Sequence, residues 1–250
     1  MKIAMSSGHG KHIRGARGSP VPPELDEVDE ARVVVEEVAE KLRSAGVECV
    51  TFHDDTSHDQ STNLATIVDW HNRQARDLDC SVHFNAFDSS AHGAEVLYVS
   101  QQTLAATISS AIADAGPFTN RGAKYRSDLY FLNNTDKPAV LIETCFCDHT
   151  GDSNNYHQNL DAICEAIAES MSGREVPELP VEPPPESVEL PIGRNRVEIT
   201  SVVRGDVSTY VNGTLVRGHE PCDHAVEYNV TLHGDVILVV NGEEFHNNIT

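Results

Sequence analysis

Four titratable side chains stand at points in the sequence where α/β proteins concentrate their chemistry. His9 lies between two glycines in SSGHG, directly after a short apolar run, and His83 lies in SVHFNA, inside a second apolar run. Glu27 opens a long amphipathic segment, and Glu143 interrupts the apolar run AVLIETCF. Functional groups of parallel sheets gather where the strands end. We therefore expect the four side chains to share one edge of a sheet.

Two histidines and a glutamate form a ligand set typical of catalytic zinc. Zinc is tetrahedral, so three protein ligands leave a fourth position for water, whose pKa falls to about 7. We assign His9, Glu27 and His83 as the ligands. A carboxylate beside the metal can move protons, and Glu143 fits that role because an unpaired carboxylate inside an apolar strand is costly. The chemistry indicated by these residues is metal-assisted amide hydrolysis.

Each of these residues taken alone has a plainer interpretation. His9 could be an ordinary turn residue and His83 a hydrogen-bonded core histidine. Glu27 could simply be a solvated acid at a helix start, where the helix dipole favours carboxylates. Only the combination with Glu143 favours a metal site.

The segments that must position these residues alternate between strand and helix up to about residue 173. Helical periodicity is clearest from Glu27 to Ala45, and Gly46 ends it. The order predicts an α/β fold, a mostly parallel sheet with helices on both faces. The expected strands are Lys2–Ser7, Val47–His53, Asp79–Asn85, Glu95–Ser100, Leu129–Leu132 and Ala139–Thr144. The other expected helices are Ser61–Arg76, Gln102–Ala115 and Asn154–Ser172.

A proline- and glutamate-rich stretch divides the chain. Residues 174–190 include VPELPVEPPPE, a composition that favours an extended linker. Residues 191–250 then show short β-like runs with turn signals, among them two Asn-Gly pairs that predict hairpins. We expect 1–173 to be the catalytic domain and 191–250 a small all-β domain.

The net charge and the lengths of the apolar runs exclude some classes of function. The formal net charge of −21 is spread along the chain and argues against nucleic-acid partners, whose phosphates need a basic face. No apolar run approaches the roughly 18 residues of a membrane span, and the N-terminus does not read as a signal peptide. We expect synthesis in the cytoplasm without a signal peptide.

Cysteines and further histidines offer weaker metal candidates. The six cysteines lie mostly in apolar runs and read as reduced and buried. Cys145 and Cys147 form a C-x-C without a second cysteine pair, which is a weak zinc signal. His12 could mimic a ligand near His9. His219, Cys222 and His224 group in GHEPCDH, where a surface loop is favoured over a second zinc site.

With these motifs in view, residues 1–172 resemble the zinc-dependent N-acetylmuramoyl-L-alanine amidases of the amidase type 3 family, particularly phage endolysins. The resemblance rests on SSGHG, on the helix from Glu27 to AGVECVTF, on SVHFNA and on FTNRGAKYRSDLYFLNNTDKPAVLIETCFCD. It implies Zn²⁺ as cofactor and peptidoglycan as substrate, with cleavage between N-acetylmuramic acid and L-alanine. It also implies substrate contacts by Asn85, Arg121 and Lys124.

Several alternatives remain open at this stage. A zinc peptidase acting on the stem peptide would share the metal chemistry and cut a different amide. A non-catalytic wall-binding or virion protein could keep the same scaffold, although it would not need both the ligand set and Glu143. An endolysin would reach the cell wall after holin-mediated release, with residues 191–250 binding a wall ligand.

Overall fold

The computed structural model divides the chain into two compact units, Met1–Leu179 and Pro180–Thr250. It describes residues 1–18 and 25–177, together with the backbone of six strands between residues 196 and 249. Most of the expected linker, 174–190, lies outside the described residues. We describe the two units separately.

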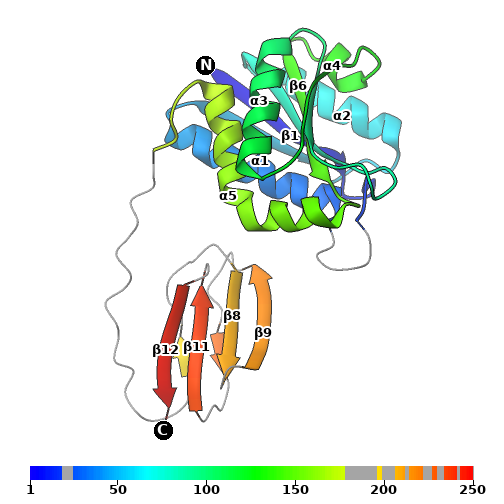
Figure 1. Cartoon of the computed structure of the whole chain (residues 1–250). Coiled ribbons are helices and arrows are strands. Elements are labelled where there is room, and N and C mark those ends of the chain that lie inside the picture. The colour runs from blue at the N-terminus through cyan, green and yellow to red at the C-terminus, as the bar shows by residue number, and fades with distance from the viewer. Residues whose placement is uncertain are drawn as a thin grey trace. The chain divides into compact units, whose positions relative to one another are not determined.

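The first unit is a six-stranded sheet covered by helices (Figure 1). Its strands are β1 (Lys2–Gly10), β2 (Glu48–Asp54), β3 (Leu78–Asn85), β4 (Ala94–Tyr98), β5 (Asn120–Tyr125) and β6 (Ala139–Phe146). Its helices are α1 (Glu27–Ser44), α2 (Gln60–Arg73), α3 (Gln102–Ala115), α4 (Tyr130–Asn134) and α5 (Thr150–Ser172).

The sheet order is β2-β1-β3-β6-β4-β5. Strands β2, β1, β3 and β6 run parallel, whereas β4 pairs antiparallel with β6 and parallel with β5. The mostly parallel α/β sheet expected from the sequence is confirmed. Because β4 and β5 are reversed, their first residues lie at the edge where β1, β3 and β6 end.

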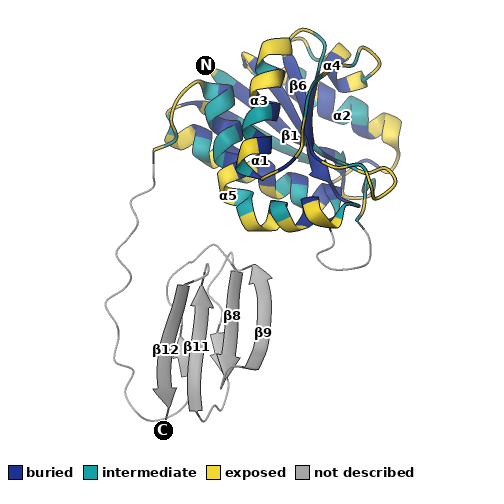
Figure 2. Cartoon of the chain, in the orientation of Figure 1, coloured by how far each residue is buried: buried dark blue, intermediate teal, exposed yellow. Residues whose placement is uncertain are grey.

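Helices pack on both faces of the sheet. The larger apolar cluster joins the sheet to α1, α3 and α5, and the smaller one joins it to α2 and α4. Figure 2 shows the buried strands in the centre and exposed residues on the outer sides of the helices. Helix α1 begins at Glu27 because Asp26 caps it, accepting hydrogen bonds from the backbone N–H groups of Val28 and Asp29.

Two expected elements differ in the structure. The segment Leu129–Leu132, predicted as a strand, starts the short helix α4, whose Phe131 and Leu132 side chains are buried beneath it. The strand β5 was not predicted, because its sequence NRGAKY contains no apolar run. This edge strand is held by pairing with β4 on one side only. Helix α5 also begins at Thr150, four residues before the expected start.

The second unit is described only through its strands. A four-stranded antiparallel sheet has the order β12-β11-β8-β9, and β10 pairs with β7. The strands are β7 (Arg196–Glu198), β8 (Asp206–Val211), β9 (Thr214–Pro221), β10 (Glu227–Asn229), β11 (Gly234–Val240) and β12 (Glu243–Ile249). The all-β character of the whole segment 191–250 stays a prediction, because its other residues lie outside the described part.

A buried polar network ties α2 to the sheet. The Asp79 carboxylate accepts two hydrogen bonds from Arg76, each 2.8 Å long, and pairs with His71 Nδ1 at 2.7 Å. The other ring nitrogen of His71 lies 3.0 Å from the Ser6 hydroxyl on β1. All of these groups are buried, so each must be matched by a partner.

We predict that Asp79→Asn lowers the free energy of unfolding by about 3 kcal/mol, because it leaves the buried Arg76 charge uncompensated. Urea unfolding measures the change. Asp69→Asn is the matched control, since Asp69 forms an exposed ion pair with Arg73 at 3.7 Å and should change stability by less than about 1 kcal/mol. Equal effects of the two substitutions would contradict the role given to the network.

Candidate metal and catalytic site

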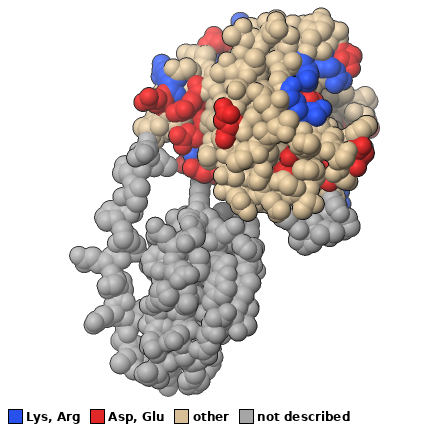
Figure 3. All heavy atoms as spheres, in the orientation of Figure 1, with Lys and Arg blue, Asp and Glu red and all other residues tan. Residues whose placement is uncertain are grey.

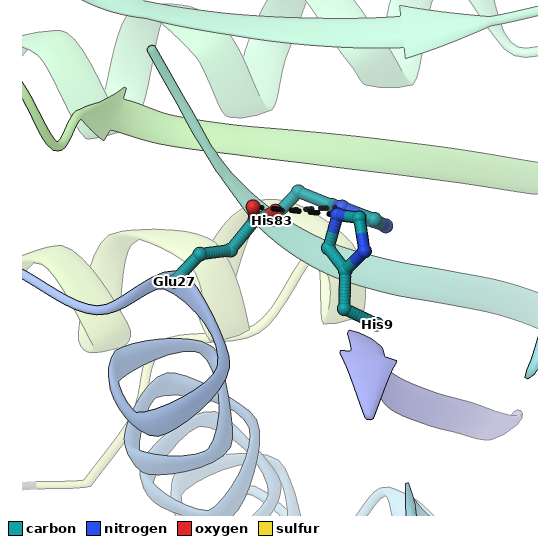
Figure 4. Close-up of side chains that lie close together, drawn as sticks. All are labelled: His9, Glu27 and His83. Carbon is teal, nitrogen blue, oxygen red and sulfur yellow. Dashed lines mark hydrogen bonds and ion pairs between the residues drawn. The ribbon is translucent and has the colours of Figure 1, made fainter. Parts of the chain in front are cut away.

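The site lies where β1, β3 and β6 end. His9 is the penultimate residue of β1, His83 lies near the end of β3, and Glu27 is the first residue of α1. Figure 4 shows both imidazole rings turned toward the Glu27 carboxylate. His83 Nδ1 is 2.9 Å from Glu27 Oε1, and His9 Nε2 is 3.3 Å from Glu27 Oε2.

One nitrogen from each histidine and one oxygen from Glu27 lie within 4.8 Å of one another. Within residues 1–18 and 25–177, this is the one group of three such side chains whose donor atoms converge so closely. Two imidazole nitrogens and a carboxylate oxygen are donors that suit zinc and other divalent transition metals. The arrangement can therefore hold a metal ion.

Glu27 is buried, with 2 % of its surface exposed. Its carboxylate accepts hydrogen bonds from the backbone N–H groups of Ala16, at 2.6 Å, and Phe84, at 3.2 Å. Burial by itself would raise the pKa of Glu27, but the hydrogen bonds and charges of His83 and His9 outweigh it and hold the pKa well below its usual range. Glu27 is thus kept ionised, as a metal ligand must be.

Glycines make room for the three side chains. A Cβ on Gly8 would come within 2.0 Å of the His83 ring. Gly15 has φ +70°, and a Cβ there would come within 2.2 Å of Glu27 Oε2 and 2.5 Å of His9 Cδ2. His9 itself adopts φ +58°, which is uncommon outside glycine. The close approach of ligand side chains to the backbone explains Gly8 and Gly15.

Asn63 on α2 fixes the backbone of His9. Its amide Nδ2 donates to the His9 carbonyl oxygen at 3.0 Å and to Asp54 Oδ2 at 2.8 Å. Asp54 is itself buried and accepts from Thr56 and Ser57. Sequence reasoning missed Asn63. The available signal was a polar residue on the buried face of an amphipathic helix, four residues before Ile67.

Glu143 lies in the strand next to His83. The two residues are register partners across β3 and β6, and Glu95 of β4 is the register partner of Glu143 on its other side. The three side chains therefore share one face of the sheet. Glu143 Oε2 is buried and has no hydrogen-bond partner among the described residues. Burial, reinforced by the charges of Glu27 and Glu95, raises the pKa of Glu143 well above its usual value.

The sequence did not single out Glu95, which organises two of the expected substrate-contacting residues. Arg121 Nε donates to Glu95 Oε2 at 2.8 Å, and Asn85 Nδ2 donates to Glu95 Oε1 at 3.3 Å. The Arg121 guanidinium also stacks over the Phe146 ring, 4.9 Å from its centroid. Lys124 is not part of this group. It is exposed and opposite Leu97, two residues beyond Glu95 along β4.

Two of the weaker metal candidates do not join the site. Cys145 and Cys147 are buried free thiols, and burial raises the pKa of both, which disfavours the thiolate that binds metal. His12 stacks on His58, with ring centroids 4.2 Å apart. The third candidate, the group of His219, Cys222 and His224, has no described side chains.

We predict that Gly15→Ala abolishes or strongly weakens metal binding, because the added methyl collides with Glu27 and His9. Gly173→Ala is the matched control, since Gly173 also has positive φ, +65°, but a Cβ there meets nothing within 4 Å. Calorimetric titration of both variants with Zn²⁺ measures the difference. Unchanged affinity in folded Gly15→Ala would contradict the geometry described here.

The lowered pKa of Asp54 should make the free energy of unfolding depend on pH. Its hydrogen bonds lower its pKa from 3.8 to about 2 despite its burial, which acts in the opposite direction. A depressed carboxyl pKa adds stability that is complete above about pH 4 and is lost as the pH falls toward 2. Asp54→Asn should therefore flatten the decline of the unfolding free energy between about pH 4 and pH 2. The exposed Asp114→Asn variant should decline as steeply as wild type, and an equally steep decline in Asp54→Asn would refute the assignment.

Comparisons with known proteins agree with this architecture. Residues 3–172 match the family model described as N-acetylmuramoyl-L-alanine amidase. An uncharacterized protein of Clostridium perfringens is 32 % identical over 186 residues, covering 71 % of this chain and 53 % of its own length. A probable cell wall amidase, LytH, of Staphylococcus epidermidis is 30 % identical over 174 residues, covering 68 % of this chain and 56 % of its own length. The chain thus spans about half the length of these curated relatives.

Solved structures share the fold of the first unit. The catalytic domain of CD27L, an endolysin targeting Clostridia difficile, superposes with a TM-score of 0.64 at 26 % identity, covering 71 % of this chain and 99 % of that domain. The catalytic domain of CwlV, an amidase from Bacillus (Paenibacillus) polymyxa var. colistinus, gives a TM-score of 0.60 at 22 % identity, covering 69 % and 97 %. The family match covers more than half of the chain, so this protein belongs to the N-acetylmuramoyl-L-alanine amidase family.

Proposed function

We propose that this chain is a zinc-dependent peptidoglycan hydrolase that cleaves the amide between N-acetylmuramic acid and L-alanine. The observation that carries the proposal is the convergence of His9, Glu27 and His83 beside Glu143. Membership of the amidase family supports the substrate class. A stem-peptide peptidase would use the same groups, so analysis of the products must distinguish the two.

The donor set fits zinc. Two imidazoles and one ionised carboxylate, with the carboxylate fixed by two backbone N–H groups, match a three-residue catalytic zinc site. His9, Glu27 and His83 would hold the ion. When bound, zinc acidifies water and polarises a carbonyl group. The hydrogen bonds from Ala16 and Phe84 to Glu27 orient this ligand.

Glu143 is the group that moves protons in this proposal. Burial raises the pKa of Glu143 above the usual carboxyl value, which increases its affinity for the proton that a general base must accept. In the reaction, Glu143 accepts a proton from the attacking water and delivers it to the nitrogen of the leaving L-alanine. Its unpartnered Oε2 leaves one oxygen available for that proton. Glu95, Asn85 and Arg121 lie beside it, and we assign the last two to substrate contact, together with the exposed Lys124.

The rest of the chain fits a lytic enzyme. We propose that 1–173 is the catalytic domain, 174–190 a linker and 191–250 a domain that binds a wall ligand. An endolysin role, with release through a holin-made pore, is part of the same proposal, supported by the likeness to the CD27L catalytic domain. No helix among the described residues is long and apolar enough to cross a membrane. On the face shown in Figure 3, basic side chains form a small patch beside acidic ones, a poor surface for nucleic acid.

We predict that Glu143→Gln lowers the rate of amide cleavage by about 10²–10⁴-fold while zinc remains bound, because proton transfer is lost and the ligands are kept. Mass spectrometry of digested peptidoglycan detects released stem peptides with L-alanine amino termini, and elemental analysis gives the zinc content. His83→Ala should lose both zinc and activity.

Glu48→Gln, which changes an exposed glutamate of β2, is the control and should behave as wild type. Wild type that binds zinc but leaves the muramoyl amide intact would exclude the proposed activity. Release of peptides cut within the stem would favour the peptidase instead.

A further inference from the structure

The Phe87 side chain is exposed to solvent in the loop after β3, at the edge of the sheet that carries the candidate site. Of the five large hydrophobic side chains that are exposed in the described residues, it has the highest exposed fraction, 80 %, followed by Tyr125 at 61 %. It lies two residues after Asn85, in the segment that joins β3 to β4. Exposing a whole aromatic ring forgoes the hydrophobic stabilisation that burial would give.

The backbone that carries Phe87 is fixed by hydrogen bonds. Asp148 Oδ2 accepts from the N–H groups of Phe87, at 3.0 Å, and Ser89, at 2.8 Å. Asp88 Oδ1 accepts from the N–H groups of Ser90 and Ala91. Ser89 adopts φ +63°, a conformation that most residues avoid and that often marks a functional loop. The backbone at Phe87 is therefore held by its own loop and by Asp148, which follows β6.

This loop belongs to the functional edge of the sheet. It follows the end of β3, four residues after His83, and the carbonyl oxygen of His92 accepts from Arg121 at 3.4 Å. Tyr125, by contrast, is the last residue of the reversed strand β5, and Tyr130 lies between β5 and β6, at the opposite edge. Of these three exposed aromatic side chains, Phe87 is the one that follows a strand at the edge carrying His83 and Glu143.

We infer that Phe87 is a substrate-binding residue that stacks on a sugar ring of the glycan strand, an inference that rests on the proposed function. A phenyl ring has no hydrogen-bonding group, so it matches the C–H face of a pyranose. The neighbouring Asp88 and Ser89 are both exposed and offer a carboxylate and a hydroxyl for sugar hydroxyls. A loop whose backbone is already fixed loses little conformational entropy on binding. A contact with a sugar ring would favour long glycan over short fragments.

The test compares two soluble substrates that carry the same stem peptide, one on a single muramoyl sugar and one on a tetrasaccharide. The full chain and its Phe87→Ala, Phe87→Trp and Tyr130→Ala variants are assayed for kcat and KM on each. Tyr130→Ala is the matched control, because it removes an exposed aromatic ring from the opposite edge. Thermal unfolding verifies that each variant is folded.

We expect wild type to prefer the tetrasaccharide and Phe87→Ala to lose about five- to tenfold of that preference, mainly through KM. Phe87→Trp should retain the preference, and Tyr130→Ala should match wild type. The inference is overturned if wild type cleaves both substrates equally well, or if Phe87→Ala keeps the preference. Wild type that releases no peptide from either substrate would instead reject the proposed function itself.

Discussion

The burial of one ionised carboxylate constrains the whole N-terminal unit. Glu27 is nearly inaccessible, and an isolated buried carboxylate is unfavourable by several kcal/mol. The structure compensates with backbone donors from two segments and with an imidazole on each carboxylate oxygen. Meeting that requirement brings the start of α1 to the ends of β1 and β3. A divalent ion would complete the compensation, because it replaces two weak contacts with direct coordination.

Two carboxylates at the same edge of the sheet have different surroundings and therefore different pKa values. Glu27 faces hydrogen-bond donors, and these keep its pKa low. Glu143 is enclosed by the sheet next to Glu95, and burial with like charges raises its pKa. When two neighbouring acids have pKa values shifted in opposite directions, the one with the low pKa is usually assigned to a role as an anion. The one with the raised pKa is assigned to proton transfer. The reversed direction of β4 matters here, since it brings Glu95 and its partner Arg121 to the same edge.

Sequence patterns correctly predicted the helices and strands whose signals are local, such as an apolar stripe repeated along one helix. The expected helix Glu27–Ala45 agrees with α1 to within one residue, because its apolar stripe and its acidic start are both local signals. The segment Leu129–Leu132 was predicted wrongly, since a short apolar run reads equally well as strand or helix. Asn63 and Glu95 escaped notice because their importance comes from partners distant in the sequence. The four assigned residues do gather at one edge, although their chemical roles stay predictions.

The central claim is that His9, Glu27 and His83 together hold a zinc ion. X-ray absorption spectroscopy at the zinc edge of the zinc-loaded full chain tests it most directly, because the spectrum reports the ligand atoms themselves. We expect one zinc per chain, with two imidazole nitrogens at about 2.0–2.1 Å, a carboxylate oxygen and no sulfur. A sulfur shell near 2.3 Å would place the metal on cysteines instead. That result, or the absence of imidazole scattering, would contradict the site described here.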